Sequence, residues 1–452
     1  MKPNSFAARD IAFHIHSQTD LKLHETVGPV VMVSAKGATV TDDAGRTYLE
    51  AMSGLWCAAL GFSEERLIQA AERQLRTLPY YQNFAHRATP PAIDLAEKLI
   101  EIAPVPMSKV LFQSSGSEAN DTAIKLVWYH FAGQGRPEKR KILSHRRGYH
   151  GTSIGTASLT GLGHLHQDFH LPLDGFIHMR APHFYRESEL GETEEQFAER
   201  LIEELEARIE QEGADTIAAF MLEPAMGTGA CVIPPRSYLA KLQLVLKKHE
   251  ILLICDEVIT GFGRTGELWG STTFGLEPDI LTCAKALTGA YIPLSAVLVS
   301  EPIYAAMRAQ SEKLGTFGHG YTYGGHPVAC AIALEAIAIY EERDIAAVVR
   351  DLGNHLEARL RPLEDHPHVG EVRGIGLMWG VEFVQDKSTR KAFAPDEKVG
   401  PRLQQAAFER GLIVRALGDT LVIAPPFIIT KEQLDEAADT FSAIISEVLG
   451  QG

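Results

Sequence analysis

The sequence predicts an α/β protein organised around a mostly parallel sheet, because short apolar runs alternate with stretches of helical period through the middle of the chain. Parallel strands need crossover connections, so helices should cover both faces of this sheet. The runs expected to form strands are Lys109–Gln113, Lys141–Ser144, Thr216–Leu222, Ile251–Cys255, Ile280–Cys283 and Ala296–Val299. The stretches expected to form helices include Glu118–Ala132, Gln196–Glu212 and Tyr238–His249.

After about residue 330 the pattern changes, and it favours a second, smaller α+β domain. Helices are expected from Pro327 and near Val399–Arg410 and Lys431–Leu449. Shorter strands are expected at Leu377–Val384, Leu412–Arg415 and Thr420–Ile423. Near the other end of the chain, Thr39–Leu49 reads as a hairpin whose turn is Asp43-Ala44-Gly45.

Composition and charge are typical of a soluble globular protein and argue against several other classes. Apolar residues make up 45% of the 452 residues, and no apolar run is long enough to cross a bilayer. The formal net charge of −15, from 43 basic and 58 acidic residues, disfavours nucleic acid as a partner. The five cysteines are widely spaced without a CxxC pair, which favours reduced thiols and argues against structural zinc. Because the N-terminus lacks an apolar signal segment, we expect a cytoplasmic protein.

Polar residues follow the apolar runs at the points where the strands should end, and open α/β sheets bind ligands beyond those ends. Five successive strands bring to one edge a Ser-Gly-Ser loop that opens a helix, an aromatic residue, two acidic residues and a lysine. These residues are Ser115, Gly116, Ser117, Tyr149, Glu223, Asp256 and Lys285. Their convergence on one edge predicts a single ligand site.

Each of these residue types suits one part of pyridoxal phosphate. Backbone N–H groups at a helix start bind a phosphate, and a carboxylate at Asp256 keeps a pyridine nitrogen protonated. A lysine whose ammonium form is disfavoured, such as Lys285, can react with the aldehyde, and Tyr149 offers a face for the ring. Taken singly, the residues have simpler explanations: a helix cap at Ser115, a surface lysine, or a magnesium-binding pair at Asp256-Glu257. The magnesium-binding explanation would require a glycine-rich loop to hold a triphosphate, and this sequence has no such loop.

The motifs resemble the class III (omega-amino acid) branch of the fold-type-I pyridoxal-phosphate aminotransferases over essentially the whole chain. The matching stretches are SSGSEANDTAIK (114–125), GYHG (148–151), MLEP (221–224), ICDEVITGFGRTG (254–266), TCAKALTGAYIPLSAV (282–297) and HGYTYGGHPVACA (319–331). This resemblance implies a large domain with a seven-stranded sheet and a small domain built from both chain ends. The expected segments are 1–75 and 329–452 for the small domain and 76–328 for the large one.

The resemblance also implies roles for single residues. Lys285 would form the Schiff base with the cofactor and move the proton between Cα and the cofactor. Asp256 would pair with the ring nitrogen, and Glu223 would be the carboxylate near the ring hydroxyl. Thr322 would join the phosphate site from the neighbouring subunit of a homodimer, or of a tetramer, with shared active sites. The other expected cofactor-binding residues are Ser115, Gly116, Ser117, Tyr149, His150 and Val258.

Two features resemble the subgroup that accepts amines and uses pyruvate as amino acceptor. Trp56 is a large aromatic residue where that subgroup lines its substrate pocket. Arg415 falls where these enzymes keep an arginine for the substrate carboxylate, a bidentate task that suits a planar guanidinium. Phe84, by its place in the family, and Thr228, just beyond Glu223, are further pocket candidates. The expected activity is ping-pong transfer of an amino group from an omega-amino acid or amine to pyruvate.

Other functions stay open at this point. An aminomutase or racemase of the same fold would use the same lysine, and a binding or regulatory module would not need Lys285, Asp256 and Tyr149 together. A nicotinamide-dependent dehydrogenase would depend on the GxGxxG pattern at Gly261–Gly266, but no helical apolar period follows, so an active-site loop fits better. His166 and His170 lie four residues apart without a third ligand, so no metal is expected.

Overall fold

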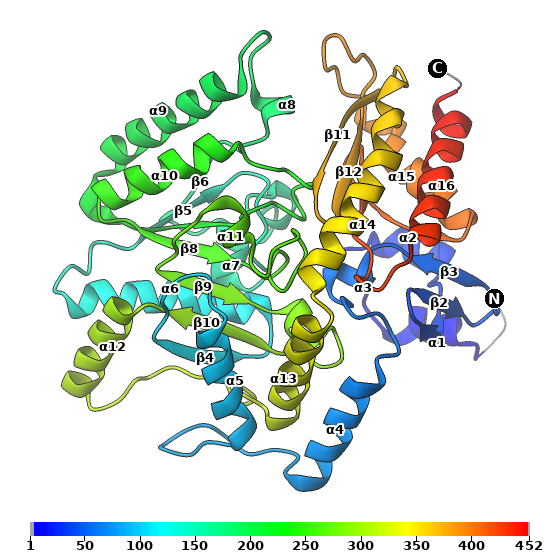
Figure 1. Cartoon of the computed structure of the whole chain (residues 1–452). Helices are drawn as coiled ribbons and strands as arrows, with labels where there is room; N and C mark the ends of the chain where they lie inside the picture. Colours follow the sequence, from blue (N-terminus) through cyan, green and yellow to red (C-terminus); the bar gives the residue numbers. More distant parts are fainter. Residues whose placement is uncertain (1–3, 451–452) are drawn as a thin grey trace.

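A seven-stranded sheet forms the centre of the computed structural model, which describes residues 4–450 (Figure 1). The strand order is β4-β10-β9-β8-β7-β5-β6, and within this sheet only β10 runs antiparallel to its neighbours. The strands are β4 (Lys109–Gln113), β5 (Lys141–His145), β6 (Phe176–Met179), β7 (Ile217–Leu222), β8 (Leu252–Asp256), β9 (Ile280–Cys283) and β10 (Ser295–Val299). The predicted mostly parallel sheet is therefore confirmed.

Helices cover both faces of this sheet because its central strands are apolar on both sides. In β7, Ala219 and Met221 pack in the core beneath α6 (Gly116–Gly133) and α12 (Glu301–Leu314). The alternate residues Phe220 and Leu222 pack in the opposite core with α9 (Glu194–Glu212) and α10 (Arg236–Lys248). The smaller helices of this part are α5 (Pro90–Glu101), α7 (Ile154–Leu159), α8 (Phe184–Glu187) and α11 (Gly270–Phe274).

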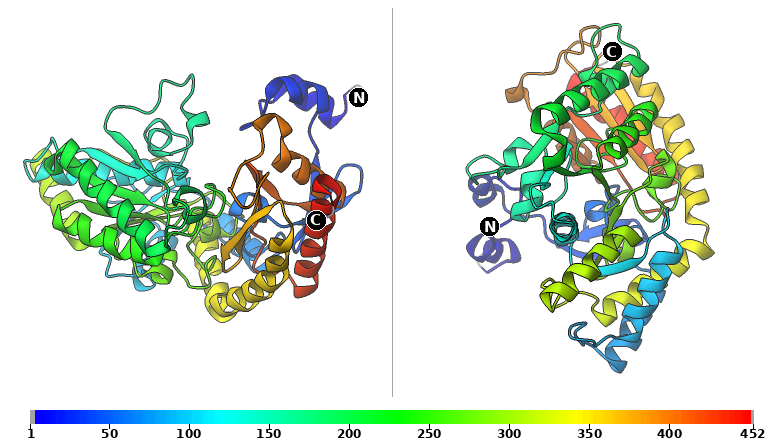
Figure 2. Two further views of the ribbon diagram at one scale, coloured as in Figure 1. Left: turned by 90° about the horizontal axis from the view of Figure 1, so that it is seen from above. Right: turned by 90° about the vertical axis from the view of Figure 1, so that its left-hand side faces the viewer.

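Both ends of the chain build the smaller part of the molecule, as the family resemblance implied. Strand β13 (Leu412–Ile413) pairs in parallel with β3 (Thr47–Glu50), which places a C-terminal strand in the N-terminal sheet. Figure 2 (left) shows the dark-blue N-terminal helices and the red C-terminal helix in this same part. Its other elements are α1 (Phe6–Phe13), α2 (Leu21–Val27), β1 (Met32–Lys36), β2 (Thr39–Asp42), α3 (Ser53–Trp56), α14 (Ile345–Leu360), β11 (Val369–Ile375), β12 (Met378–Phe383), α15 (Val399–Glu409), β14 (Arg415–Leu417), β15 (Thr420–Ile423) and α16 (Lys431–Leu449). Helices α4 (Glu65–Thr77) and α13 (Pro327–Glu342) pack together beside the large sheet.

The structure differs from the sequence prediction at several strands: β1, β6 and β11 were not predicted, and one predicted strand is divided between two sheets. The single strand expected at Leu412–Arg415 is wrong: β13 joins β3, whereas β14 pairs with β15 in another sheet, so the chain changes sheets at Val414. Strand β6 was not predicted from the residue pattern because it is a short, partly exposed edge strand without a long apolar run. Between residues 4 and 450, no helix is long and apolar enough to span a membrane.

Candidate active site

The residues that end four neighbouring parallel strands line one cavity. Lys285 follows β9, Asp256 ends β8, Glu223 follows β7 and Tyr149 lies beyond β5. They line a cavity of about 340 Å³, which we call the inner cavity. Other predicted residues on its wall are Ser115, Gly116, Ser117, His150 and Val258. The structure thus brings together the cofactor-binding residues expected from the sequence, with the exception of Thr322.

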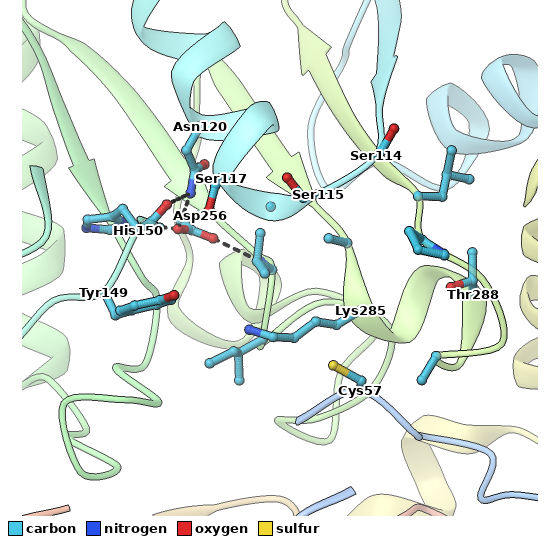
Figure 3. Close-up of a pocket in the computed structure, with 18 of the residues that line it drawn as sticks. Cys57, Ser114, Ser115, Ser117, Asn120, Tyr149, His150, Asp256, Lys285 and Thr288 are labelled. Atoms are coloured by element: carbon cyan, nitrogen blue, oxygen red, sulfur yellow. Dashed lines mark hydrogen bonds and ion pairs between the residues drawn. The ribbon is translucent and has the colours of Figure 1, made fainter. Parts of the chain in front are cut away.

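The carboxylate of Asp256 is buried and held by three hydrogen bonds. Its Oδ2 accepts from Asn120 Nδ2 at 2.7 Å and pairs with His150 Nδ1 at 2.8 Å, and its Oδ1 accepts from the Val258 backbone N–H at 3.0 Å (Figure 3). Because an ionised carboxylate only accepts, His150 is the donor of that bond. The three bonds fix the orientation of a carboxylate on the wall of the inner cavity, where it can accept from a protonated ring nitrogen.

Asn120 is a functional residue that the sequence analysis missed. Its Nδ2 also donates to the His150 backbone oxygen at 2.8 Å, and its Oδ1 accepts from Thr282 Oγ1 at 2.7 Å. It lies one helical turn after Gly116 on α6, within the recognised SGSEAN motif. The spacing of four residues from Gly116 could have predicted its place in the site, because residues i and i+4 lie on the same face of a helix.

Lys285 projects into the inner cavity from a strained backbone position. Its φ is 47°, in the left-handed region that costs a non-glycine residue roughly 1–2 kcal/mol. Figure 3 shows its side chain extending across the cavity with the amine toward Tyr149. Among the described residues we find no hydrogen bond from this amine. Burial lowers the pKa of Lys285, which favours the neutral amine that can react with a carbonyl carbon.

The N-terminus of α6 offers unpaired backbone donors to the inner cavity. Ser115 caps the helix by accepting from the Glu118 backbone N–H at 3.2 Å, while the N–H groups of Gly116 and Ser117 donate to no residue between 4 and 450. A Cβ at Gly116 would lie 3.0 Å from Val258 Cγ1, a tight contact that the Val258 side chain would have to relieve by moving, so glycine favours this close packing. Free N–H groups at the positive end of a helix dipole form an anion site.

Glu223 positions the Tyr149 segment. Its Oε1 accepts from the Tyr149 backbone N–H at 2.9 Å, and its Oε2 accepts from the Gly227 backbone N–H at 3.0 Å. Burial raises the pKa of Glu223 to about 7. Near neutral pH this buried carboxyl can therefore hold or release a proton at the wall of the cavity.

A second cavity of about 640 Å³, the outer cavity, shares Tyr149 and Lys285 with the inner one. Trp56, Thr228 and Arg415 line it, as predicted for a substrate pocket. Among the described residues, Arg415 forms no ion pair and the buried Trp56 Nε1 has no hydrogen-bond partner. Burial lowers the pKa of Arg415, but its guanidinium stays charged near neutral pH.

Two predicted residues lie outside the inner and outer cavities. Thr322 is exposed, and the Tyr80 hydroxyl donates to its backbone oxygen at 2.8 Å. Phe84 is 45% exposed and lines a separate cavity with His319 and Tyr321. The GxGxxG segment Gly261–Gly266 forms turns after β8 and lines neither cavity, so the expectation that it forms an active-site loop finds no support in these two cavities.

The inner cavity fits pyridoxal phosphate in each of its chemical parts. It combines an amine without a protein partner, a helix N-terminus with free donors and a buried, oriented carboxylate. A fold with a mostly parallel seven-stranded sheet and this site together define a pyridoxal-phosphate enzyme.

Comparison with known proteins gives the family. Residues 22–445 match the family model for Aminotransferase class-III, and the chain belongs to that family. Gamma aminobutyrate transaminase 1, mitochondrial, of Solanum lycopersicum is 46% identical over 422 residues, which are 93% of this chain and 82% of that protein. The omega transaminase from Pseudomonas jessenii in complex with PMP superposes with a TM-score of 0.97 at 46% identity, over 99% of this chain and 100% of that one. An omega transaminase variant engineered for asymmetric synthesis of enantiopure bulky amines superposes with a TM-score of 0.97 at 46% identity. The match covers 98% of this chain and 99% of that one.

These findings confirm the predicted family, fold type, enzyme class and cofactor. The chain is an aminotransferase that uses pyridoxal phosphate to move amino groups from amines to keto acids. A nicotinamide-dependent dehydrogenase, an aminomutase and a racemase are not favoured, because the family and the relatives named above are aminotransferases.

Proposed function

We propose that this enzyme transfers the amino group of an omega-amino acid or an amine to pyruvate in two half-reactions that use the same lysine, Lys285. The observation that carries the proposal is Arg415, a guanidinium without an ion pair among the described residues, on the wall of a cavity that also holds Trp56. A small keto acid offers the carboxylate that this guanidinium can bind at two points. The aromatic wall suits the apolar part of an amine.

Within this proposal, each residue has a task set by its surroundings. When bound, pyridoxal phosphate supplies an aldehyde carbon that takes up the amino group and a ring that accepts an electron pair. The neutral Lys285 Nζ removes the proton from the amine-bearing carbon of the donor and returns a proton in the second half-reaction. Asp256 would hold a proton on the ring nitrogen, and the first N–H groups of α6 would bind the phosphate.

A match in residue spacing supports the assignment of the outer cavity, which Trp56 and Arg415 line, to the substrate. The engineered omega transaminase variant carries substitutions at one tryptophan, one phenylalanine and one arginine. These three residues have the same spacing along that chain as Trp56, Phe84 and Arg415 have here. We therefore assign the same three positions to substrate selection in this enzyme.

We further propose a homodimer in which Thr322 and Phe84 complete the site of the partner copy. Both are exposed in the single chain, and they lie near each other: Phe84 lines a cavity with His319 and Tyr321, and Thr322 directly follows Tyr321 in the chain. If Thr322 reaches the phosphate site of a second copy, Phe84 reaches its substrate pocket from the same surface. Sedimentation of the holoenzyme as a monomer would contradict this arrangement.

A cytoplasmic location stays a prediction from the sequence.

The proposed activity is tested with a panel of donors crossed with two acceptors. The donors are 4-aminobutyrate, β-alanine, a diamine and an aromatic amine, and the acceptors are pyruvate and 2-oxoglutarate. We expect alanine to form from pyruvate with at least one of these donors, faster than glutamate forms from 2-oxoglutarate. Formation of glutamate alone would contradict the choice of pyruvate. Isomerisation of a single substrate without any acceptor would instead indicate an aminomutase or racemase.

A further inference from the structure

Near the N-terminus, three imidazole rings converge on one carboxylate. Asp10 Oδ1 lies 3.0 Å from His14 Nδ1, and Asp10 Oδ2 lies 2.9 Å from His16 Nε2 and 3.0 Å from His24 Nε2. The ring centroids of His16 and His24 are 4.3 Å apart. The donor atoms of Asp10, His14 and His16 all lie within 4.8 Å of one another, and His24 contacts the same carboxylate.

The four side chains come from three successive pieces of chain. Asp10 lies on α1, His14 and His16 follow its C-terminal end, and His24 lies on α2. His24 is nearly buried and His14 is 66% exposed, so the cluster is supported from inside and open to solvent on one side. In Figure 2 (left) these dark-blue helices lie at the outer surface of the smaller part, where an ion from solution can reach them.

We propose that Asp10, His14, His16 and His24 bind one divalent transition-metal ion, for which Zn²⁺ is the best match. Three neutral imidazoles and one carboxylate form a donor set that Zn²⁺ binds in a tetrahedron. Zinc–nitrogen and zinc–oxygen bonds of about 2.0–2.1 Å require donors roughly 3.3 Å apart. Each imidazole nitrogen lies 2.9–3.0 Å from an oxygen of Asp10, and the donor atoms of Asp10, His14 and His16 all lie within 4.8 Å of one another, so side-chain rotations would have to bring the imidazoles, His24 included, to the spacing of one ion.

A second group of metal-type side chains shows why this cluster is the better candidate. His183, Glu371 and Glu382 also converge, but both carboxylates are already bound by arginine: Arg373 lies 2.7 Å from Glu371 and also pairs with Glu382. A metal ion there would have to displace a guanidinium. Within residues 4–450, Asp10 has no lysine or arginine partner, so its charge is available.

Metal binding would fix the link between α1 and α2. Gln18 lies in that link, two residues after His16, and lines the outer cavity. The ion would therefore restrain a segment that borders the substrate pocket while leaving Lys285 and Asp256 untouched. This proposal replaces the sequence-based expectation that the chain holds no metal.

The test uses the tag-free holoenzyme, titrated with Zn²⁺ in competition with a chromophoric chelator. We expect one tight Zn²⁺ per chain, and Co²⁺ in its place should give the visible absorption of a tetrahedral site without a thiolate band. Asp10→Asn and His16→Ala should each weaken Zn²⁺ binding at least about 100-fold. Replacing residues that only support metal ligands already lowers metal affinity about 10–100-fold, and loss of a ligand should cost more.

The matched control is His355→Ala, because His355 pairs with a single aspartate, Asp435, at 2.8 Å. Its removal should leave the tight Zn²⁺ site unchanged. Less than one tight Zn²⁺ per wild-type chain would overturn the proposal. So would equal affinity in the Asp10→Asn, His16→Ala and wild-type proteins, or a thiolate band that identifies a cysteine as ligand.

Discussion

Asn120 donates a 2.7 Å hydrogen bond to the buried carboxylate of Asp256. Asn120 belongs to α6, whose first turn faces the inner cavity, and Asp256 ends β8. The bond therefore joins the element proposed to bind the phosphate to the group proposed to pair with the ring nitrogen. One contact between a helix and a strand would therefore help to position both ends of the cofactor.

Replacing Asp256 by asparagine should reduce kcat by roughly 10²–10⁴-fold while cofactor stays bound, because an amide cannot hold a proton on the ring nitrogen. Steady-state rates and the absorbance of bound cofactor measure the two effects separately. Asn120→Ala removes one of the three hydrogen bonds to the carboxylate and should reduce kcat less. A larger loss in Asn120→Ala than in Asp256→Asn would contradict the assigned roles.

Gly116→Ala should weaken the binding of pyridoxal phosphate at least about tenfold, because the new Cβ would meet Val258 Cγ1 at 3.0 Å and Cγ2 at 3.2 Å. Titration of the apoenzyme with cofactor measures the dissociation constant. The matched control is Gly133→Ala at the other end of α6, away from the cavity, where the Cβ would lie 3.3 Å from Gln310 Cβ and 3.7 Å from the Ala306 backbone oxygen. Equal changes in both variants would indicate a general effect on the helix.

Arg415→Ala should impair the half-reaction with pyruvate much more than the half-reaction with a neutral amine. Loss of a two-point carboxylate contact costs about 2–4 kcal/mol, or roughly 30- to 1000-fold in kcat/KM for the keto acid. Single-turnover measurements of each half-reaction give the two values. Arg415→Lys keeps the charge but loses the planar pair of donors, so it should fall between the wild type and Arg415→Ala. Equal losses in both half-reactions would refute a carboxylate-binding role.

Glu50 supports the loop that carries Trp56, and burial raises its pKa to about 7. Its Oε1 accepts from the Met52 backbone N–H at 3.1 Å, and its Oε2 accepts from the Gly54 backbone N–H. A carboxyl with a raised pKa keeps its proton in the folded state after the unfolded chain has lost it. Folding stability therefore falls as pH rises between the unfolded value of 4.5 and about 7.

Glu50→Gln removes this titration, so its stability should depend less on pH than that of the wild type. Between pH 4.5 and 7 the wild type should lose on the order of 2–3 kcal/mol relative to the variant. Apparent melting temperatures of both proteins at pH 5 and pH 8 measure the difference. Parallel pH dependence in the two proteins would show that Glu50 keeps an ordinary pKa.

The sequence predicted the inner cavity well because parallel strands impose its geometry. A residue that directly follows a buried apolar run must lie at the end of its strand, so Glu223, Asp256 and Lys285 could be assigned to one edge before any coordinates. The pairing of Asp256 with Thr282 across β8 and β9 places Lys285 three residues further along the chain, just beyond the end of β9. The order and direction of the strands are therefore enough to predict where these three residues lie.

Contacts that depend on packing between distant elements could not be predicted in the same way. The hydrogen bond from Asn120 to Asp256 depends on how α6 packs against β8. The passage of the chain from one sheet to another at Val414 depends on the pairing of β13 with β3. The cluster at Asp10 depends on the fold of the link to His24, where Gln18 takes a positive φ of 52°. Periodicity contains no information on such side-chain convergence.

The most direct test of the central claim is to reduce the holoenzyme with sodium borohydride and locate the attached pyridoxyl group by peptide mass spectrometry. The account predicts that the group is on Lys285, and that Lys285→Ala yields no labelled peptide and no turnover. A label on another lysine, or a Lys285→Ala enzyme with undiminished turnover, would contradict it.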